Sequence, residues 1–261
     1  MRTPAGEALV CEPLRAVARH LFTTRGWALG SAASGRDAGA WQQVASALGV
    51  DASRLVRVRQ VHGAAVVVER AGSSRASAPS GRALREADII LSDDPSLALA
   101  IQTADCVPLL MADRRSGAAA AAHAGWRGLA SRVPSIAVQA MAAEFGSRPA
   151  DLVAAIGPSI SAARYEVGAD VRARFESAGF PLDWLAAWFS DGVRPDHWQF
   201  DGWQSARDQL EAAGVPAAGI HSSRLCTACD GDRFCSYRRD GAGAGRMAAA
   251  IRPRGAQDFA A

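Results

Sequence analysis

The chain has 261 residues, of which 49% are hydrophobic and 21% are charged, and its formal net charge is +3. A chain of this length buries about 75% of the surface that its unfolded form exposes, so it does not depend on disulfides for stability. The small net charge and the dispersed basic residues argue against a nucleic-acid-binding protein. The lack of an apolar run of 18 residues argues against a membrane protein.

The basic residues are all arginines, because the sequence contains no lysine. A guanidinium group suits phosphate or carboxylate, but it cannot serve as a lysine base or form a Schiff base. The five cysteines, an odd number spread over a long chain, favour reduced thiols over a disulfide framework. The segment Met1–Phe22 lacks an uninterrupted apolar core and a cleavage signal. We therefore expect a cytoplasmic protein.

The first part of the chain is predicted to consist mainly of short strands. Residues 1–30 are expected to be irregular apart from a strand over Leu21–Thr24, and residues 71–85, rich in Ser, Ala, Gly and Arg, are expected to form a loop. Helical spacing of apolar residues covers Trp41–Leu48. Extended segments are predicted over Leu55–Val58, Val61–Val68 with a turn at Gly63, Ala87–Leu91 and Leu97–Ile101.

The second part alternates strands with helices, without a regular period. Helices are predicted over Gly128–Glu144, Ala169–Ala178 and Gln204–Ala213. Strands are predicted over Val107–Ala112, Ala118–Ala122, Leu152–Ile156, Ile220–Leu225 and Met247–Ile251. Since neither a repeat nor a linker stands out, we expect a single domain over residues 1–261, of the α/β class, built as a layered sandwich with a mixed β-sheet.

Three segments place reactive side chains among small and turn-forming residues. A strand is predicted to end or bend at the reactive residue of each, where the sheet fixes the geometry and the loop leaves access. The segments are Arg59-Gln60-Val61-His62-Gly63, Gln102-Thr103-Ala104-Asp105-Cys106-Val107-Pro108 and Ala122-His123-Ala124-Gly125-Trp126-Arg127-Gly128.

His62, Cys106 and His123 would together offer two imidazole nitrogens and one thiolate. This set suits zinc, which prefers four nitrogen or sulfur ligands and keeps a position open for water when the protein supplies three. The spacings are long and match no short metal-binding motif. Two other interpretations stay open at this point: packed core residues, or a metal-free Cys–His pair acting as nucleophile and base.

Five phrases of the sequence, in this order, resemble the YfiH family: RQVHG, LAIQTADCVPLLMAD, AAAHAGWRG, AAIGPSISAARYEVG and FCSYRRDGAGAGR. The resemblance extends from about Phe22 to Ile251, which is nearly the whole chain. This family was formerly labelled multicopper polyphenol oxidase or laccase-domain protein, and it includes purine nucleoside phosphorylases related to FAMIN.

The resemblance implies a layered α/β fold like that of the catalytic domain of cytotoxic necrotizing factor. It implies that His62, Cys106 and His123 are catalytic zinc ligands. The implied activities are phosphorolysis of adenosine, inosine and methylthioadenosine, with adenosine deamination in addition. The expected partners are therefore purine nucleosides and inorganic phosphate rather than nucleic acid or membrane, and the expected assembly is a monomer or a small homo-oligomer.

Other polar residues in the same motifs are candidates for the site. Guanidinium groups hold phosphate through paired hydrogen bonds, and positions in the family motifs favour Arg127 and Arg239, the latter as a further catalytic residue. Asp105 is expected either to orient a ligand histidine or to cap a turn, and Tyr165 and Glu166 either to contact substrate or to pack. The candidates for binding substrate or phosphate are Arg25, Gln60, Asp105, Arg127, Tyr165 and Arg238.

The segment Cys226-Thr227-Ala228-Cys229 admits a redox pair or a second zinc site. A structural zinc site needs four ligands, so Cys235 and His221 would have to complete the set. We favour structural thiols here. The sequence also departs from the family pattern, because residues 26–31 lack the usual Gly-Gly pair and asparagine, and Cys235 replaces an aromatic residue.

Two other enzyme classes compete with the phosphorylase. A copper-dependent polyphenol oxidase, or laccase, is disfavoured because several copper centres need many more histidines than the five present, and the sequence has no His-x-His pair. A single copper ion in the His62, Cys106 and His123 set remains an alternative to zinc. A hydrolase that edits peptidoglycan precursors would instead use Cys106 as the nucleophile and a histidine as the base.

Overall fold

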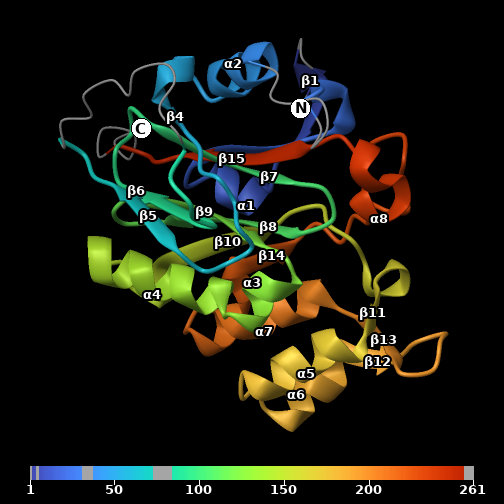
Figure 1. Ribbon diagram of the computed structural model, residues 1–261. Helices are drawn as coiled ribbons and strands as arrows, with labels where there is room; N and C mark the ends of the chain where they lie inside the picture. The colour runs from blue at the N-terminus through green and yellow to red at the C-terminus, as the bar shows by residue number, and fades with distance from the viewer. Residues whose placement is uncertain (1, 4–5, 31–37, 73–83, 256–261) are drawn as a thin grey trace.

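The computed structural model describes residues 2–3, 6–30, 38–72 and 84–255, and in Figure 1 its elements stack in four layers. Two six-stranded sheets lie face to face in the middle. One outer face is covered by α2 (Ala38–Ala47), and the other by α3 (Trp126–Ala130), α4 (Val133–Phe145) and α7 (Gly202–Ala212). This arrangement confirms the predicted class, a layered α/β sandwich, with two mixed sheets at its centre.

The first sheet contains both ends of the described chain. Its strand β7 shows why the layers form, because Leu99 and Ile101 face the other sheet while the alternate residues Ala98 and Ala100 face α2. All neighbouring pairs are antiparallel except β4 with β7. The strand order is β1 (Arg2–Thr3), β2 (Gly6–Leu9), β3 (Arg19–Thr23), β15 (Met247–Arg252), β7 (Ala98–Thr103) and β4 (Leu55–Val56).

The second sheet is buried on both faces. All seven residues of β8 are buried, and the first six of them form the continuous apolar run that the sequence shows there. In the next strand, β9, the run Ala119–Ala122 is wholly buried and lies between α4 and the first sheet. The strand order is β14 (Ile220–Ser222), β10 (Leu152–Ile156), β8 (Val107–Asp113), β9 (Ala119–Ala124), β6 (Ile89–Ser92) and β5 (Val66–Glu69).

A smaller subregion lies at the end of the sandwich, below and to the right in Figure 1. Its core is Phe175, whose ring lies between 5.0 and 6.0 Å from the rings of Phe180, Trp188, Phe189 and Phe200. It consists of the three-stranded sheet β11 (Glu166–Gly168), β13 (His197–Phe200) and β12 (Phe189–Asp191), with α5 (Ala169–Ser177) and α6 (Leu182–Trp188).

The remaining elements are short. The helices α1 (Glu12–Arg15) and α8 (Tyr237–Asp240) have four residues each. Turns of 3₁₀ helix cover Arg25–Trp27, Ala52–Arg54, Pro149–Asp151, Ala162–Arg164, Ala217–Gly219 and Gly241–Gly243. Within the described ranges, none of the helices combines the length and the apolar character that crossing a membrane requires.

Several predicted boundaries were wrong. The helix expected over Gly128–Glu144 is two helices, because Arg132 takes a left-handed conformation with φ +62° and Pro134 starts a new first turn. Residues 61–65 do not continue a strand, since His62 is also left-handed and β5 begins at Val66. The supposedly irregular residues 1–30 contain β1, β2 and α1. Most of the predicted loop over residues 71–85 lies outside the described residues.

Candidate metal centre

The side chains of His62, Cys106 and His123 converge at one end of the two central sheets. Their ligand atoms all lie within 4.8 Å of one another, and His123 is buried, Cys106 partly buried and His62 exposed. The two imidazole rings meet edge to face, with centroids 4.8 Å apart and an interplanar angle of 82°. Within the described ranges, no other group of three or more His, Cys, Asp or Glu side chains offers a comparable metal site.

Strand pairing explains how residues so far apart in the sequence meet. In the antiparallel pair of β8 and β9, Pro108 faces His123 and Val107 faces Ala124. Cys106 directly precedes β8 and therefore lies beside the end of β9 that carries His123. The loop between β4 and β5 brings His62 to the same end.

A buried carboxylate, Asp88, holds both histidines. Nδ1 of His123 donates to its Oδ1 over 2.8 Å, and the backbone N–H of His62 donates to the same oxygen over 3.1 Å. The backbone N–H groups of Gly63 and Val61 donate to Oδ2 over 2.7 and 3.2 Å. With Nδ1 carrying the proton, Nε2 of His123 is the nitrogen left to bind a metal.

His62 is held in an uncommon backbone conformation. Its φ of +59° is in the left-handed region, which costs a residue other than glycine roughly 1–2 kcal/mol. Asp88 offsets this cost because it accepts the backbone N–H groups of Val61, His62 and Gly63 at once. The bend turns the chain so that the His62 side chain faces Cys106 and His123.

Gly125 lies against two of the three ligands, Cys106 and His62. A Cβ atom at this position would lie 2.8 Å from Sγ of Cys106 and 3.2 Å from Cδ2 of His62. Atoms this close would displace one ligand or the other. The glycine of the Ala122–Gly128 motif therefore provides the space in which the thiol and the imidazole sit.

Neighbouring groups shift the pKa values of Cys106 and His123. Burial alone would raise the pKa of the Cys106 thiol, but the charges and hydrogen bonds of His123 and His62 outweigh it and lower that pKa to about 6. Burial alone would lower the pKa of His123, whereas Cys106 and Asp88 raise it to about 9. For Asp88, hydrogen bonds from His123 and Gly63 outweigh burial and hold its pKa below the usual range. The site thus favours the thiolate, which is the form that binds a metal.

The metal site opens into a cavity of about 630 Å³, a size common for small-molecule sites. Guanidinium groups lie over aromatic rings in its wall: Arg127 is 4.2 Å from the ring centroid of Trp126, and Arg238 is 5.0 Å from that of Tyr165. The wall can therefore offer flat rings to a planar base and cations to an anion. Its aromatic and basic lining residues are Trp41, Arg57, Arg59, Trp126, Arg127, Tyr165, Tyr237, Arg238 and Arg246.

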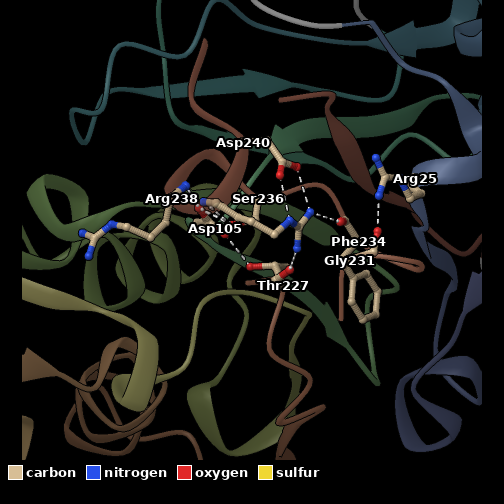
Figure 2. Close-up of polar contacts among 9 residues, drawn as sticks. Arg25, Asp105, Thr227, Gly231, Phe234, Ser236, Arg238 and Asp240 are labelled. Atoms are coloured by element: carbon tan, nitrogen blue, oxygen red, sulfur yellow. Dashed lines mark hydrogen bonds and ion pairs between the residues drawn. The ribbon is translucent and has the colours of Figure 1, made fainter. Parts of the chain in front are cut away.

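A second buried carboxylate, Asp105, organises another part of this wall. Its Oδ1 accepts a hydrogen bond of 2.6 Å from the Thr227 hydroxyl. Its Oδ2 accepts from the Ser236 hydroxyl over 3.1 Å and from the Arg238 backbone N–H over 2.6 Å (Figure 2). Asp105 thus accepts its hydrogen bonds next to the start of α8, whereas the carboxylate that contacts His123 is Asp88.

The other predicted site residues divide into two groups. Gln60 lines the cavity, and its amide pairs with the backbone of Gln102 on β7 through bonds of 2.8 and 2.7 Å. Tyr165, whose pKa is raised by burial, also lines the cavity. Arg25 and Arg239 lie outside the lining, and Arg25 donates to the carbonyl of Gly231.

The guanidinium group of Arg239 is committed to its own part of the chain. It donates to both carboxylate oxygens of Asp240, over 2.7 and 2.8 Å, and to the carbonyls of Thr227 and Phe234, each over 2.9 Å (Figure 2). These bonds tie the residues before α8 to the segment that contains Thr227. Glu166 is similarly engaged, since the backbone N–H of Arg194 and its guanidinium hold the pKa of the carboxyl down to about 2.

Sequence reasoning missed Asp88 and Gly125. Asp88 opens the apolar run Ile89–Leu91, where a charged residue entering a buried strand was a signal that could have been followed. Gly125 was visible inside a motif, but its role depends on the distance to Cys106, which requires the fold.

Comparison with known proteins agrees with this picture. The family described as multi-copper polyphenol oxidoreductase laccase matches residues 37–254. A purine nucleoside phosphorylase of Deinococcus radiodurans is 40% identical over 209 residues, which cover 80% of this chain and 74% of that protein. A protein named adenosine deaminase RL5, from an unknown prokaryote, is 34% identical over 204 residues, covering 78% of this chain and 76% of that one.

The fold is likewise shared with solved structures. The hypothetical protein YfiH of Bacillus licheniformis superposes with a TM-score of 0.86 at 28% identity, covering 97% of this chain and 98% of that one. YlmD of Geobacillus stearothermophilus gives a TM-score of 0.83, with the same identity and coverage. These matches confirm the resemblance to the YfiH family that the five motifs indicated.

Proposed function

This chain belongs to the YfiH-type family described as multi-copper polyphenol oxidoreductase laccase, and we propose that it is a zinc-dependent purine nucleoside phosphorylase. The observation that carries this proposal is the position of the His62, Cys106 and His123 cluster in a cavity lined with arginines and aromatic rings. The names of several relatives point to the same reaction. We propose adenosine, inosine and methylthioadenosine as substrates, with phosphate as the nucleophile.

The donor set fits zinc. Two imidazoles and a thiolate are ligands that zinc prefers, and three protein ligands leave one coordination position open. His62, Cys106 and His123 would hold the ion, and a bound zinc would supply a Lewis acid at this wall of the cavity. Asp88 prepares the site for the ion because it fixes the proton of His123 on Nδ1.

The remaining wall supplies the groups that phosphorolysis needs. We propose that Arg127 and Arg238 hold the phosphate and that Trp126 and Tyr165 contact the purine ring. A phosphate oxygen then attacks C1′ of the ribose, the glycosidic bond breaks, and the departing base takes up the proton that the hydrogen phosphate gives up. Holding the phosphate beside the sugar lowers the barrier by orientation and stabilises the positive charge that develops on the ribose. Arg239, with its donors bonded to Asp240 and two carbonyls, acts by positioning α8.

Adenosine deamination is a second candidate activity of the same centre. It is supported by the relative named adenosine deaminase and by a ligand set that leaves one position open on zinc. The two reactions give different products from adenosine, because deamination yields inosine and ammonia while phosphorolysis yields adenine and ribose 1-phosphate.

The test is to incubate zinc-loaded protein with adenosine and phosphate and to identify the products. We expect adenine and ribose 1-phosphate from the wild type and loss of both in Cys106→Ala. Arg127→Gln and Arg238→Gln are each expected to raise KM for phosphate about tenfold, the size of one lost charged hydrogen bond. Arg148→Gln, which removes an exposed partner of Asp151, is the matched control. No phosphorolysis by the wild type, or an undiminished rate in Cys106→Ala, would refute the proposal.

Metal analysis separates the competing chemistries. Protein purified without added metal is expected to contain zinc, whereas copper together with oxidase activity would support the polyphenol oxidase alternative. A covalent adduct on Cys106 in metal-depleted and still active protein would favour a Cys–His hydrolase acting on peptidoglycan precursors.

We further propose that the protein acts in the cytoplasm on small molecules, as a single domain and as a monomer or small homo-oligomer. The five cysteines, an odd number spread over the chain, support a reducing compartment, and the small formal net charge of +3 supports small-molecule substrates over nucleic acid. Size-exclusion chromatography with light scattering tests the assembly.

A further inference from the structure

A pair of cysteines lies outside the metal site but is linked to its cavity. Cys226 and Cys229 are three positions apart in a turn, and each thiol shifts the pKa of the other. Cys229 is exposed, while Cys226 is partly buried. Two neighbouring thiols, one of them open to solvent, are the starting arrangement for a disulfide.

Ser161 stabilises the ionised form of Cys226. Its hydroxyl donates to Sγ of Cys226 over 3.1 Å, and its backbone N–H donates to the same sulfur over 3.4 Å. Burial would raise the pKa of Cys226, but the hydrogen bonds from Ser161 and Cys229 outweigh it and lower that pKa. Cys226 is therefore the nucleophile of the pair, and Cys229 is placed to resolve a mixed disulfide.

A second metal site does not account for this pair. Zinc would need further ligands beside the two thiols, and among the described residues the clustered His, Cys, Asp or Glu ligands are His62, Cys106 and His123. Cys235 and His221, which the sequence suggested as completing ligands, do not join the pair in such a cluster.

Thr227, which lies between the two cysteines in the sequence, connects the pair to the cavity wall. Thr227 donates through its hydroxyl to Oδ1 of Asp105 over 2.6 Å, and its backbone N–H donates to the Ser159 carbonyl over 3.1 Å. Asp105 in turn accepts the backbone N–H of Arg238 (Figure 2). A change in the turn that carries Thr227 therefore acts on the carboxylate that places Arg238.

A parallel connection passes through Ser161. Its neighbour Ile160 lines the cavity and donates its backbone N–H to the Asp105 carbonyl over 3.0 Å. If Cys226 becomes part of a disulfide, its sulfur loses the negative charge that the two Ser161 donors favour. Both connections from the pair thus end at Asp105, which directly precedes the ligand Cys106.

We propose that Cys226 and Cys229 form a reversible disulfide with a low-molecular-weight disulfide as the oxidant, and that this bond loosens the hydrogen bonds of Asp105. The Cys226 thiolate attacks one sulfur of the oxidant, the S–S bond of the oxidant breaks, and the leaving thiolate takes a proton from water. The Cys229 thiol then gives its proton to water and attacks Sγ of Cys226, which releases the second thiol. Two electrons pass from the pair to the oxidant, and a thiol reductant reverses the step.

The hydrogen bonds of Asp105 weaken because the disulfide closes a small ring that includes the backbone of Thr227. A disulfide between residues three apart restricts the turn and moves the backbone that presents Thr227. The hydrogen bond from Thr227 to Asp105 then lengthens, and the carboxylate no longer holds the Arg238 N–H firmly. The expected result is a more mobile start of α8, the helix that contributes Tyr237 and Arg238 to the cavity.

The first test follows the covalent bond, with the full-length protein carrying its own metal. The protein is treated with oxidised glutathione, its free thiols are blocked, and it is cleaved after arginine. The peptide Leu225–Arg233 contains Cys226 and Cys229 and no other cysteine. An internal disulfide therefore gives a peptide that is two hydrogen atoms lighter than the reduced form and carries no blocking group on either cysteine. We expect this peptide from the wild type and from the control Cys11→Ser, but not from Cys229→Ser. Recovery of the wild-type peptide fully blocked, or as a stable mixed disulfide, would overturn the proposal.

The second test follows the coupling and needs no substrate. Hydrogen exchange of the amides in residues 234–240 is compared between reduced and oxidised protein by mass spectrometry. In the wild type and in Cys11→Ser, oxidation is expected to speed exchange about fivefold or more, the lower end of ordinary coupling between sites, and Cys229→Ser should show no change. Unchanged or slower exchange in wild-type protein that carries the disulfide would overturn the proposed coupling between the cysteine pair and α8. Neither of the two tests depends on the proposed phosphorylase reaction.

Discussion

Two buried carboxylates, Asp88 and Asp105, organise two different walls of the same cavity. Asp88 accepts three backbone N–H groups from the loop around His62, and Asp105 accepts one from the start of α8. Asp88 in addition accepts the imidazole Nδ1–H of His123, whereas Asp105 accepts the neutral hydroxyls of Thr227 and Ser236. Similar burial and similar hydrogen bonding thus serve two purposes.

The difference lies in what each carboxylate positions. Asp88 fixes the orientation of His123 and the bend at His62, so under the proposed function it governs whether an ion is held. Asp105 fixes the backbone at Arg238, so under the same proposal it governs how phosphate is held. Substituting the two residues should therefore affect metal content in one case and substrate binding in the other, and the following predictions test that distinction.

The largest effect is expected from Asp88→Asn. An asparagine cannot accept both the His123 Nδ1–H and the three backbone N–H groups, because its amide nitrogen is a donor. Metal affinity should fall about 10- to 100-fold, as is typical when the partner of a ligating histidine is lost, and activity should fall with it. Competition with a chelator measures the affinity.

The control for this substitution is Asp113→Asn. Asp113 is also buried and accepts hydrogen bonds from Arg115 and Ser116, but at the far end of β8. The Asp113→Asn substitution should lower thermal stability without changing metal affinity. Equal metal loss in both variants would mean that general destabilisation, and not the contact with His123, explains the result.

A smaller loss of metal is expected from Gly125→Ala. The added methyl group would lie 2.8 Å from Sγ of Cys106, so the thiol must shift and metal affinity should fall about tenfold. Gly243→Ala is the matched control, because a Cβ at Gly243 meets nothing within 4 Å. The same chelator competition applies, and an unchanged affinity in Gly125→Ala would contradict the assigned geometry.

Asp105→Asn is expected to leave metal affinity unchanged. It removes one of two acceptors that serve Thr227, Ser236 and Arg238, which should lower the free energy of unfolding by about 1–3 kcal/mol. If Arg238 binds phosphate, KM for phosphate should rise about fivefold with a smaller change in kcat. Urea unfolding and initial-rate kinetics measure the two effects. Loss of metal as large as in Asp88→Asn would remove the distinction between the two walls.

The smallest effect is expected from a partly buried carboxylate, Glu166. The backbone N–H and the guanidinium of Arg194 hold its pKa at about 2, below the ordinary 4.5. A lowered pKa in the folded state stabilises the protein above pH 4.5, and this contribution disappears as the pH falls towards about 2. Glu166→Gln should therefore weaken the acid dependence of stability over that range and lower stability slightly at neutral pH. Urea midpoints measured across this range check it; an unchanged acid dependence would contradict the assignment.

The sequence was informative where chemistry and pattern coincide. The three predicted ligands stand in motifs rich in small residues, and six of the seven buried residues of β8, residues 107–112, form a continuous apolar run. The break before α4 was missed, because the helical spacing of apolar residues runs on across Arg132 and Pro134. The short strands β1 and β2 have too few residues for a periodicity, and the three-stranded sheet is built around aromatic contacts rather than strand patterns.

Asp88 marks the limit of what could be predicted. A single aspartate before an apolar run has many structural roles, and its contact with His123 depends on β6 pairing with β9. The contact between Asp88 and His123 joins residues 35 positions apart and is not encoded in either segment alone. The same holds for Asp105, whose partners Thr227 and Ser236 lie 122 and 131 positions away.

The alanine run of β9 has a consequence for how this enzyme tolerates change. Because Ala119–Ala122 fill the space between α4 and the first sheet without exposed surface, an added methyl group there must push a layer outward or displace the strand. The sandwich can absorb such a shift, but the imidazole of His123 travels with the strand. Conservative core replacements that would pass unnoticed elsewhere are thus expected to disable this protein while leaving it folded.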